Sequence, residues 1–210
     1  MVAQERRAVA DTLSGLDSRQ WATPSLCQAW TVHDVAAHLL MPLVTSLPRL
    51  AVAMVGSGFN FDRANIKLTA AVSRRSNDEI VTGLRANAEH RFTPPGMGPE
   101  APLTDAIVHG QDIRRPLGIT HAFDPEHLRR SLTFLTGKSQ GFVPKGLVAG
   151  VRFEATDLDW QGGDGAGNGA VARGTGEAIV LTMTGRRIAV ADLEGPGVDL
   201  LRDRLGLGRL

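Results

Sequence analysis

Apolar residues recur at helical spacing through the first two thirds of the chain. Near the amino terminus Val9 and Leu13 lie four residues apart among charged residues, which predicts an amphipathic helix. A second helix is predicted to begin near Thr31, because Thr31 followed three residues later by Asp34 resembles a capping box. Helical spacing then continues as far as Pro42, where we expect this helix to end.

Three further helical segments are predicted before the composition changes. The first covers 62–92 and is interrupted by the polar stretch SRRSNDE, where Ser76 or Asn77 is the expected cap of a new helix. This segment therefore predicts a helical hairpin. The other two cover 101–114 and 125–136, the former ending shortly before a proline and the latter beginning with one.

From about Gly146 the pattern changes to short stretches with partial alternation. VRFEATD and AIVLTMTG carry β-branched residues and predict two or more strands. Between them Gln161–Gly176 holds seven glycines in sixteen residues and predicts a flexible connection. Helical spacing returns over 196–207. We therefore expect an α+β chain, with helices over 1–140 and a small α/β domain over 146–210.

Composition narrows the class of protein. The 210 residues carry 23 Lys and Arg against 22 Asp and Glu, and this balance lacks the basic excess of a nucleic-acid-binding protein. The single Cys27 excludes an intramolecular disulfide and a multi-cysteine zinc site. The amino terminus lacks a signal-peptide pattern, and residues 39–55 are interrupted by two prolines and an arginine. We expect a cytoplasmic protein with neither nucleic acid nor a membrane as its partner.

Two histidines lie on the predicted helix that follows Thr31. His33 and His38 are five residues apart, so they lie about 140° apart around a helix and cannot share one face. We expect His33 to face water. His38 lies on the apolar side with Val35 and Leu39, where a hydrogen-bonded core histidine is a more common role than a metal ligand.

The stretch TDAIVHGQDIRRPLG places three candidate ligands on one helix. Asp105, His109 and Asp112 fall in a stripe about 60° wide, and four-residue spacing lets two side chains reach one ion. Imidazole with carboxylate suits zinc or another divalent first-row metal. The alternative is a solvated face that carries an ordinary charge pair. The apolar neighbours Ile107 and Ile113 count against that alternative.

Weaker candidates have ordinary structural interpretations. GDGAGNG over 163–169 lacks the Lys-Ser or Lys-Thr of a phosphate loop and is more typical of a connection between strands. Cys27 is either a reactive thiol or a small buried residue. No G-x-S-x-G elbow indicates a serine hydrolase. Two arginine pairs are surface charges or anion clamps: Arg114 with Arg115, and Arg186 with Arg187.

Three strings in this order resemble the mycothiol-dependent maleylpyruvate isomerase family. They are PSLCQAWTVHDVAAHL, DAIVHGQDIRRPLG and TGRRIAVADLEGPG, and together they span most of the chain. The amino-terminal domain of that family belongs to the DinB-like metal-binding helical bundles. The resemblance implies a four-helix bundle followed by a small α/β domain whose late part contains a run of strands.

The resemblance also implies a metal site. The family's ligands fall on His38, Asp105 and His109, although Asp105 stands where the family more commonly has Glu, and Asp112 is the alternative third ligand. The implied metal is of the zinc type and binds the sulfur of mycothiol. We further expect the carboxy-terminal domain to contribute a cation, Arg186 or alternatively Arg187, with the two side chains on opposite faces of a strand.

These features predict a metal-dependent enzyme that uses mycothiol. Its partners would be a small-molecule thiol and a small electrophile, and the reaction an isomerisation or a thiol transfer. A non-catalytic thiol- or ligand-binding stress-response protein on the same bundle is one alternative, which Asp105 keeps open. A metal-dependent hydrolase is another. The sequence leaves open the electrophile, the native metal and the oligomeric state.

Overall fold

The computed structural model describes residues 1–94, 96–137, 139, 141–163 and 169–208. Contacts divide the chain into two compact units. The first comprises Met1–Pro94 and Pro102–His121, and the second comprises Pro95–Ala101 and Ala122–Leu210. This division differs from a boundary after residue 140, because the helix Pro125–Thr136 packs on later elements of the second unit.

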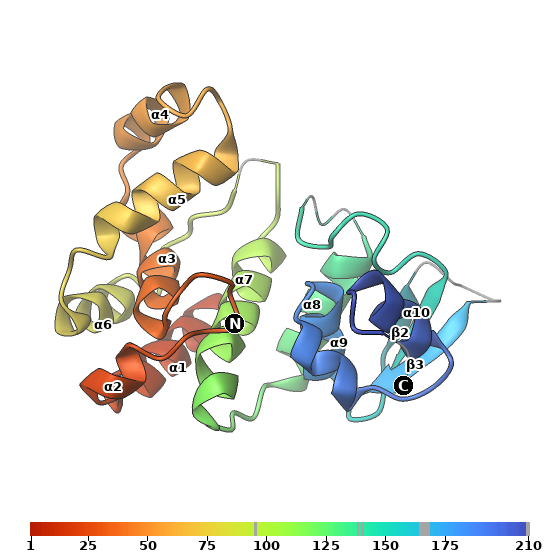
Figure 1. Cartoon of the computed structure of the whole chain (residues 1–210). Coiled ribbons are helices and arrows are strands. Elements are labelled where there is room, and N and C mark those ends of the chain that lie inside the picture. Colours follow the sequence, from red (N-terminus) through yellow and green to blue (C-terminus); the bar gives the residue numbers. More distant parts are fainter. Residues whose placement is uncertain (95, 138, 140, 164–168, 209–210) are drawn as a thin grey trace. The chain divides into compact units, whose positions relative to one another are not determined.

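The first unit is built of helices (Figure 1), and buried apolar side chains from several of them form a core. Helix α3 packs against α2, α5 and α6, while α1 packs against α6 and α4 against α5. Gly83 of α6 permits the close approach to α3, because a Cβ there would lie 2.9 Å from a Leu40 methyl. The helices are α1 (Val2–Ser14), α2 (Ser18–Trp21), α3 (Val32–Val44), α4 (Leu47–Val55), α5 (Phe61–Val72), α6 (Asn77–Ala86) and α7 (Glu100–Arg114).

Local capping explains where the helices begin. Thr31 and Asp34 form a capping box at α3, and Ser76 forms one with Glu79 at α6, so both predicted starts are confirmed. Helix α3 nevertheless continues through Pro42 to Val44, which corrects the expected end. Proline removes only one backbone hydrogen bond here, and burial of the apolar side chains on both sides of it keeps the last turn helical.

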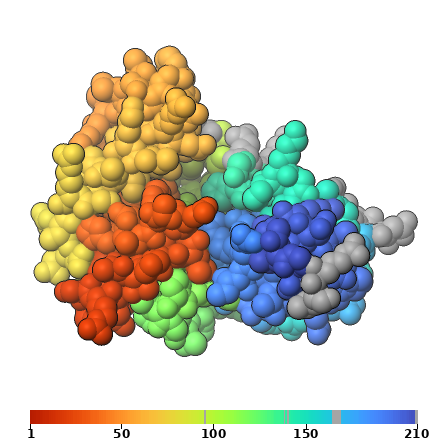
Figure 2. Space-filling view, in the orientation of Figure 1, coloured from red at the N-terminus to blue at the C-terminus, as the bar shows by residue number. Residues whose placement is uncertain are grey.

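Helix α4 was not predicted from the sequence pattern. It has Pro48 in its first turn and no buried residue, and Leu47 and Val52 are well exposed. Figure 2 shows this orange segment at the surface of the first unit. Among the described residues no single helix is long and apolar enough to cross a membrane, and the pair α3 and α4, which together reach that length and composition, is bent by 116°.

The second unit contains a three-stranded sheet in the order β2-β1-β3. Strand β1 pairs antiparallel with β2 and parallel with β3, with Phe153 opposite Gly162 and Ala172. Helix α8 packs against α9, and both α9 and α10 pack against β1 and β3. The elements are α8 (Pro125–Thr136), β1 (Val151–Ala155), β2 (Gln161–Gly163), β3 (Ala170–Gly174), α9 (Gly176–Met183), a 3-10 helix (Arg187–Asp192) and α10 (Gly197–Arg204). An α+β chain with a small sheet is therefore confirmed.

Two expectations for the second unit are wrong. The predicted strand AIVLTMTG is the helix α9, whose cap is Thr175 and which is buried on every side except at Glu177. A uniformly apolar run has no period that separates a helix from a strand. The predicted flexible segment 161–176 instead contains β2 and β3, while the centre of GDGAGNG, 164–168, lies outside the described residues.

Candidate metal centre

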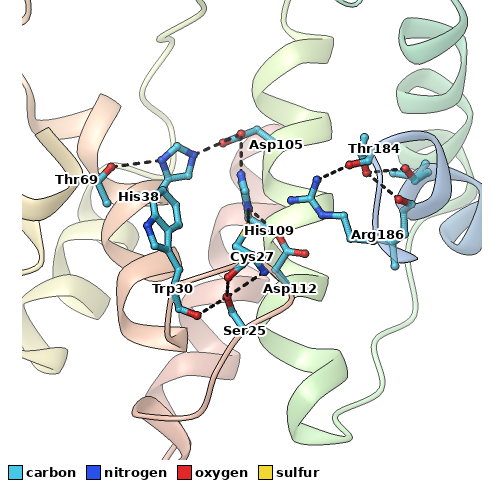
Figure 3. A network of polar contacts seen from close by, with 12 residues as sticks. Ser25, Cys27, Trp30, His38, Thr69, Asp105, His109, Asp112, Thr184 and Arg186 are labelled. Atoms are coloured by element: carbon cyan, nitrogen blue, oxygen red, sulfur yellow. Dashed lines mark hydrogen bonds and ion pairs between the residues drawn. The ribbon is translucent and has the colours of Figure 1, made fainter. Parts of the chain in front are cut away.

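Three predicted ligands converge within the first unit (Figure 3). Helix α3 supplies His38, and α7 supplies Asp105 and His109 one turn apart. Oδ1 of Asp105 lies 3.8 Å from Nε2 of His38 and 3.4 Å from Nε2 of His109, and the three ligand atoms all lie within 4.8 Å of one another. His38, on the apolar face of α3, thus lies against Asp105 and His109 of α7 rather than in a purely apolar core.

These separations fit the coordination of a metal ion. With metal–ligand bonds of about 2.0–2.2 Å, two ligand atoms of a tetrahedral site lie about 3.3–3.6 Å apart. The Asp105 contacts of 3.4 and 3.8 Å are close to that range. Two imidazole nitrogens and one carboxylate oxygen are also the donor types that a zinc-type ion accepts. The residues present therefore fit the group that the sequence implied.

Both histidine rings are held from behind by a second polar group. Nδ1 of His38 lies 3.5 Å from the hydroxyl of Thr69 on α5, and Nδ1 of His109 lies 2.8 Å from Oδ2 of Asp112. The ring of Trp30 packs on His38 with centroids 5.2 Å apart. Such outer contacts fix the ring and its tautomer. Thr69 and Trp30 were missed by sequence reasoning, since their spacing along the chain carries no signal of this contact.

Asp112 lies on the other side of the His109 ring from Asp105. Asp105 is 30% exposed and faces Nε2, whereas the Asp112 side chain is fully buried and faces Nδ1. Cys27, His109 and Asp112 form a second group of potential ligands. Oδ2 of Asp112 lies 2.8 Å from Nδ1 of His109 and 3.0 Å from Sγ of Cys27, which are hydrogen-bond distances shorter than ligand–ligand separations around an ion.

The electrostatics of the site favour a cation. Burial alone would lower the pKa of His109, but the charge of Asp105 and the hydrogen bond to Asp112 raise it to about 10. A proton on this ring therefore compensates the neighbouring carboxylates when no metal ion is present. A divalent ion at Nε2 can take over that role.

Two polar residues differ from expectation. His33 does not point freely into water: Nδ1 lies 2.8 Å from Oδ1 of Asn77 and Nε2 lies 2.9 Å from the carbonyl of Ser73, so it ties α3 to the turn before α6. Arg114 is not a surface charge, because its side chain is buried and Nε donates to the hydroxyl of Thr12 at 3.0 Å. In both cases the deciding partner lies on another helix.

The paired arginines of the second unit do not lie on a strand. Arg186 is an extended residue between α9 and the 3-10 helix, and its Nη1 donates to the carbonyl of Thr184 at 2.8 Å. Arg187 is exposed and donates to the carbonyl of Gly206 at 2.9 Å. The expectation of alternate strand faces is therefore wrong, as is the late run of strands, since a 3-10 helix occupies Arg187–Asp192.

Comparisons with known proteins agree with the fold and with the predicted resemblance. Residues 2–94 match the family model of the mycothiol maleylpyruvate isomerase N-terminal domain. A crystal structure of the mycothiol-dependent maleylpyruvate isomerase is 16% identical, covers 93% of each chain and has a TM-score of 0.52. A structure of a mutant of that isomerase in which a histidine is replaced by alanine is 17% identical over 93% of each chain, with a TM-score of 0.54. No curated protein sequence matches the chain.

Proposed function

Because this chain carries the amino-terminal domain of the mycothiol maleylpyruvate isomerase family, we propose that it is a metal-dependent enzyme that uses mycothiol to act on a small electrophile. The reaction is an isomerisation or a thiol transfer. The observation that carries the proposal is the convergence of His38, Asp105 and His109 from two helices. We further propose that α1, α3, α6 and α7 form the DinB-like four-helix bundle, and that the protein acts in the cytoplasm.

The three residues would hold a divalent ion, for which zinc is the best match. Two neutral imidazoles and one carboxylate leave a zinc site with a net charge of about +1, which favours an anionic fourth ligand. When bound, such an ion lowers the pKa of a thiol so far that the sulfur reacts as a thiolate. Three protein ligands with one open position are typical of catalytic rather than structural zinc sites.

The side chains around the ligands prepare them for this role. The carboxylate of Asp112 accepts a hydrogen bond from Nδ1–H of His109, which keeps the proton on Nδ1 and leaves the lone pair on Nε2 free for the ion. Thr69 serves His38 in the same way at a longer distance. Asp105 is the ligand most accessible to water, so its short side chain is the weakest part of the site.

We propose Arg186 as the cation that binds an anionic group of the electrophile, with Arg187 as the alternative. Arg186 is half-buried and donates to the backbone carbonyl of Thr184, and such anchoring reduces the entropy lost when an anion binds. Arg187 is exposed, and an ion pair formed by an exposed arginine contributes little free energy.

Metal analysis and thiol titration test the proposal together. Protein purified without chelator should carry close to one zinc-type ion per chain. Calorimetric titration with mycothiol near pH 7, in buffers of different ionisation enthalpy, should release close to one proton per thiol bound, because a free thiol has a pKa of about 8.5. The His109→Ala variant should release none, and His90→Ala, which changes an exposed histidine of the same unit, should behave as wild type.

The outcomes separate the proposal from its alternatives. Mycothiol binding that is equally tight with and without metal would contradict a thiol-activating ion and favour a non-catalytic binding protein. Metal binding without any thiol binding would favour a metal-dependent hydrolase.

A further inference from the structure

The buried side of His109 contains a thiol that the proposed chemistry does not use. Sγ of Cys27 lies 3.0 Å from Oδ2 of Asp112, the same oxygen that lies 2.8 Å from Nδ1 of His109. The Asp112 side chain is fully buried, so its carboxylate needs hydrogen-bond donors within the protein interior. A carboxylate in such a place keeps its orientation only through the donors around it.

The loop that carries Cys27 comprises residues 22–30, between α2 and the cap of α3, and its hydrogen bonds hold Cys27 in place. The hydroxyl of Ser25 accepts from the backbone N–H of Cys27 at 3.1 Å and donates to the carbonyl of Trp30 at 2.8 Å. The N–H of Leu26 donates to the backbone carbonyl of Asp112 at 3.2 Å. The loop is therefore joined to the same residue of α7 through both backbone and side chain.

The same loop contacts both histidines of the metal centre. Its last residue, Trp30, packs on the ring of His38, while Cys27 lies against Asp112 and 3.7 Å from Nδ1 of His109 (Figure 3). Ala29 has a φ of 67°, a left-handed conformation that a non-glycine residue rarely adopts, which lets the chain reverse between these two contacts. Thus one short loop braces two ligands that come from different helices.

We propose that Cys27 is a positioning residue, whose S–H donates to Asp112 and thereby fixes the carboxylate on Nδ1 of His109 so that Nε2 is presented to the metal ion. This role rests on the proposed function, because it needs an ion at Nε2. Cys27 is not itself a ligand in this scheme: its contact with Asp112 is a hydrogen bond, and His109 turns Nδ1 rather than Nε2 toward it. A thiol is a weak donor, so the effect is smaller than that of Asp112 itself.

Cobalt(II) titration of the metal-free protein tests the role. Loss of an outer partner of a metal-bound histidine costs about 10–100-fold in affinity, so Asp112→Ala should weaken cobalt binding by that factor. Cys27→Ala, one step further out, should weaken it about 3–10-fold. Cys27→Ser retains a donor and should restore most of the loss. Gln28→Ala, an exposed change in the same loop, should have no effect and serves as the matched control.

A double-mutant cycle separates positioning from packing. If Cys27 acts through Asp112, adding Cys27→Ala to Asp112→Ala should weaken cobalt binding no further, since neighbours that act as one unit are not additive. A purely structural role would lower the melting temperature of the metal-free protein and leave cobalt affinity unchanged. That result in Cys27→Ala would overturn the proposal.

The visible spectrum of the cobalt protein provides a second readout. A wild-type thiolate-to-cobalt charge-transfer band that Cys27→Ala abolishes would show that Cys27 is a ligand and would also overturn the positioning role. If the wild-type protein binds no cobalt, both the proposed function and the positioning role are contradicted. If wild type binds cobalt and Cys27→Ala binds it equally well, only the positioning role falls.

Discussion

The two sides of the His109 ring are lined by the same residue type in opposite environments. On the Nε2 side Asp105 is partly exposed and lies 3.4 Å away, near the separation of two ligands of one ion. On the Nδ1 side Asp112 is fully buried and lies at hydrogen-bond distance. Both carboxylates lie on α7, seven residues apart. Burial and distance, rather than residue type, therefore separate the expected ligand from the group that orients it.

Among the substitutions at this site, replacing His38 or His109 should have the largest effect on metal affinity. His38→Ala or His109→Ala removes one of the three proposed ligands, so we expect metal affinity to fall at least about 100-fold. The helical circular dichroism should be retained. Native mass spectrometry checks the metal content, with His90→Ala as the control. Full metal content in both variants would contradict the site.

The two carboxylates should then differ from each other. Asp105→Ala removes a proposed ligand together with its charge, whereas Asp112→Ala removes a proposed outer partner and should lower metal affinity by about 10–100-fold. We therefore expect Asp105→Ala to lose more metal than Asp112→Ala in parallel zinc titrations. The reverse order would make Asp112 the third ligand and would invert the comparison of the two sides.

The raised pKa of His109 predicts a specific pH dependence for the metal-free protein. The folded-state pKa of about 10 exceeds the ordinary value of 6.5, because nearby carboxylates outweigh burial. The resulting stabilisation is fully present below pH 6.5 and is lost as pH rises through about 10. The melting temperature should therefore fall across this range, and less so in His109→Ala. Metal affinity should rise with pH instead, since the ion needs the unprotonated ring.

In the second unit, the adjacent residues Arg186 and Arg187 are expected to differ by a smaller amount in their effect on activity. Arg186 is half-buried and bonded to Thr184, while Arg187 is exposed. We expect Arg186→Ala to raise the KM for an anionic electrophile by about tenfold, the loss of one charge-assisted hydrogen bond, and Arg187→Ala to change it less than twofold. Steady-state kinetics at saturating thiol measures this. Equal, unchanged values would exclude both arginines from the site.

Signals that act within a few residues predicted much of the fold. Thr31 and Ser76 cap helices because their hydroxyls reach a backbone N–H three residues on, which is visible in the sequence. The strand predicted over 178–185 is wrong because α9 is buried on nearly every side. Its apolar residues show no helical or strand period, so the surrounding structure decides its conformation.

The candidate site shows the same limit. The four-residue spacing of Asp105 and His109 indicates that they share a face, but their meeting with His38 came from the family resemblance. The positions of His33 and Cys27 depend on partners 40 or more residues away, namely the Ser73 carbonyl and Asp112. Spacing along one helix carries no information about a neighbouring helix, so these contacts became visible only in three dimensions.

The smallest expected effect distinguishes stability from metal binding in the helix that carries His38. Thr31→Ala removes the cap of α3 and Ser76→Ala removes the equivalent cap of α6, so each should lower the free energy of unfolding by about 1 kcal/mol. Neither residue contacts a ligand of the proposed ion in any hydrogen bond described for it. Urea unfolding of the metal-free proteins checks the stabilities, and zinc titration of the folded proteins should give unchanged affinities. If Thr31→Ala weakened zinc binding while Ser76→Ala did not, the stability of the first turn of α3 would contribute to the position of His38. The polar contacts of Thr69 and Asp112 with the two histidines would then not be sufficient to orient them.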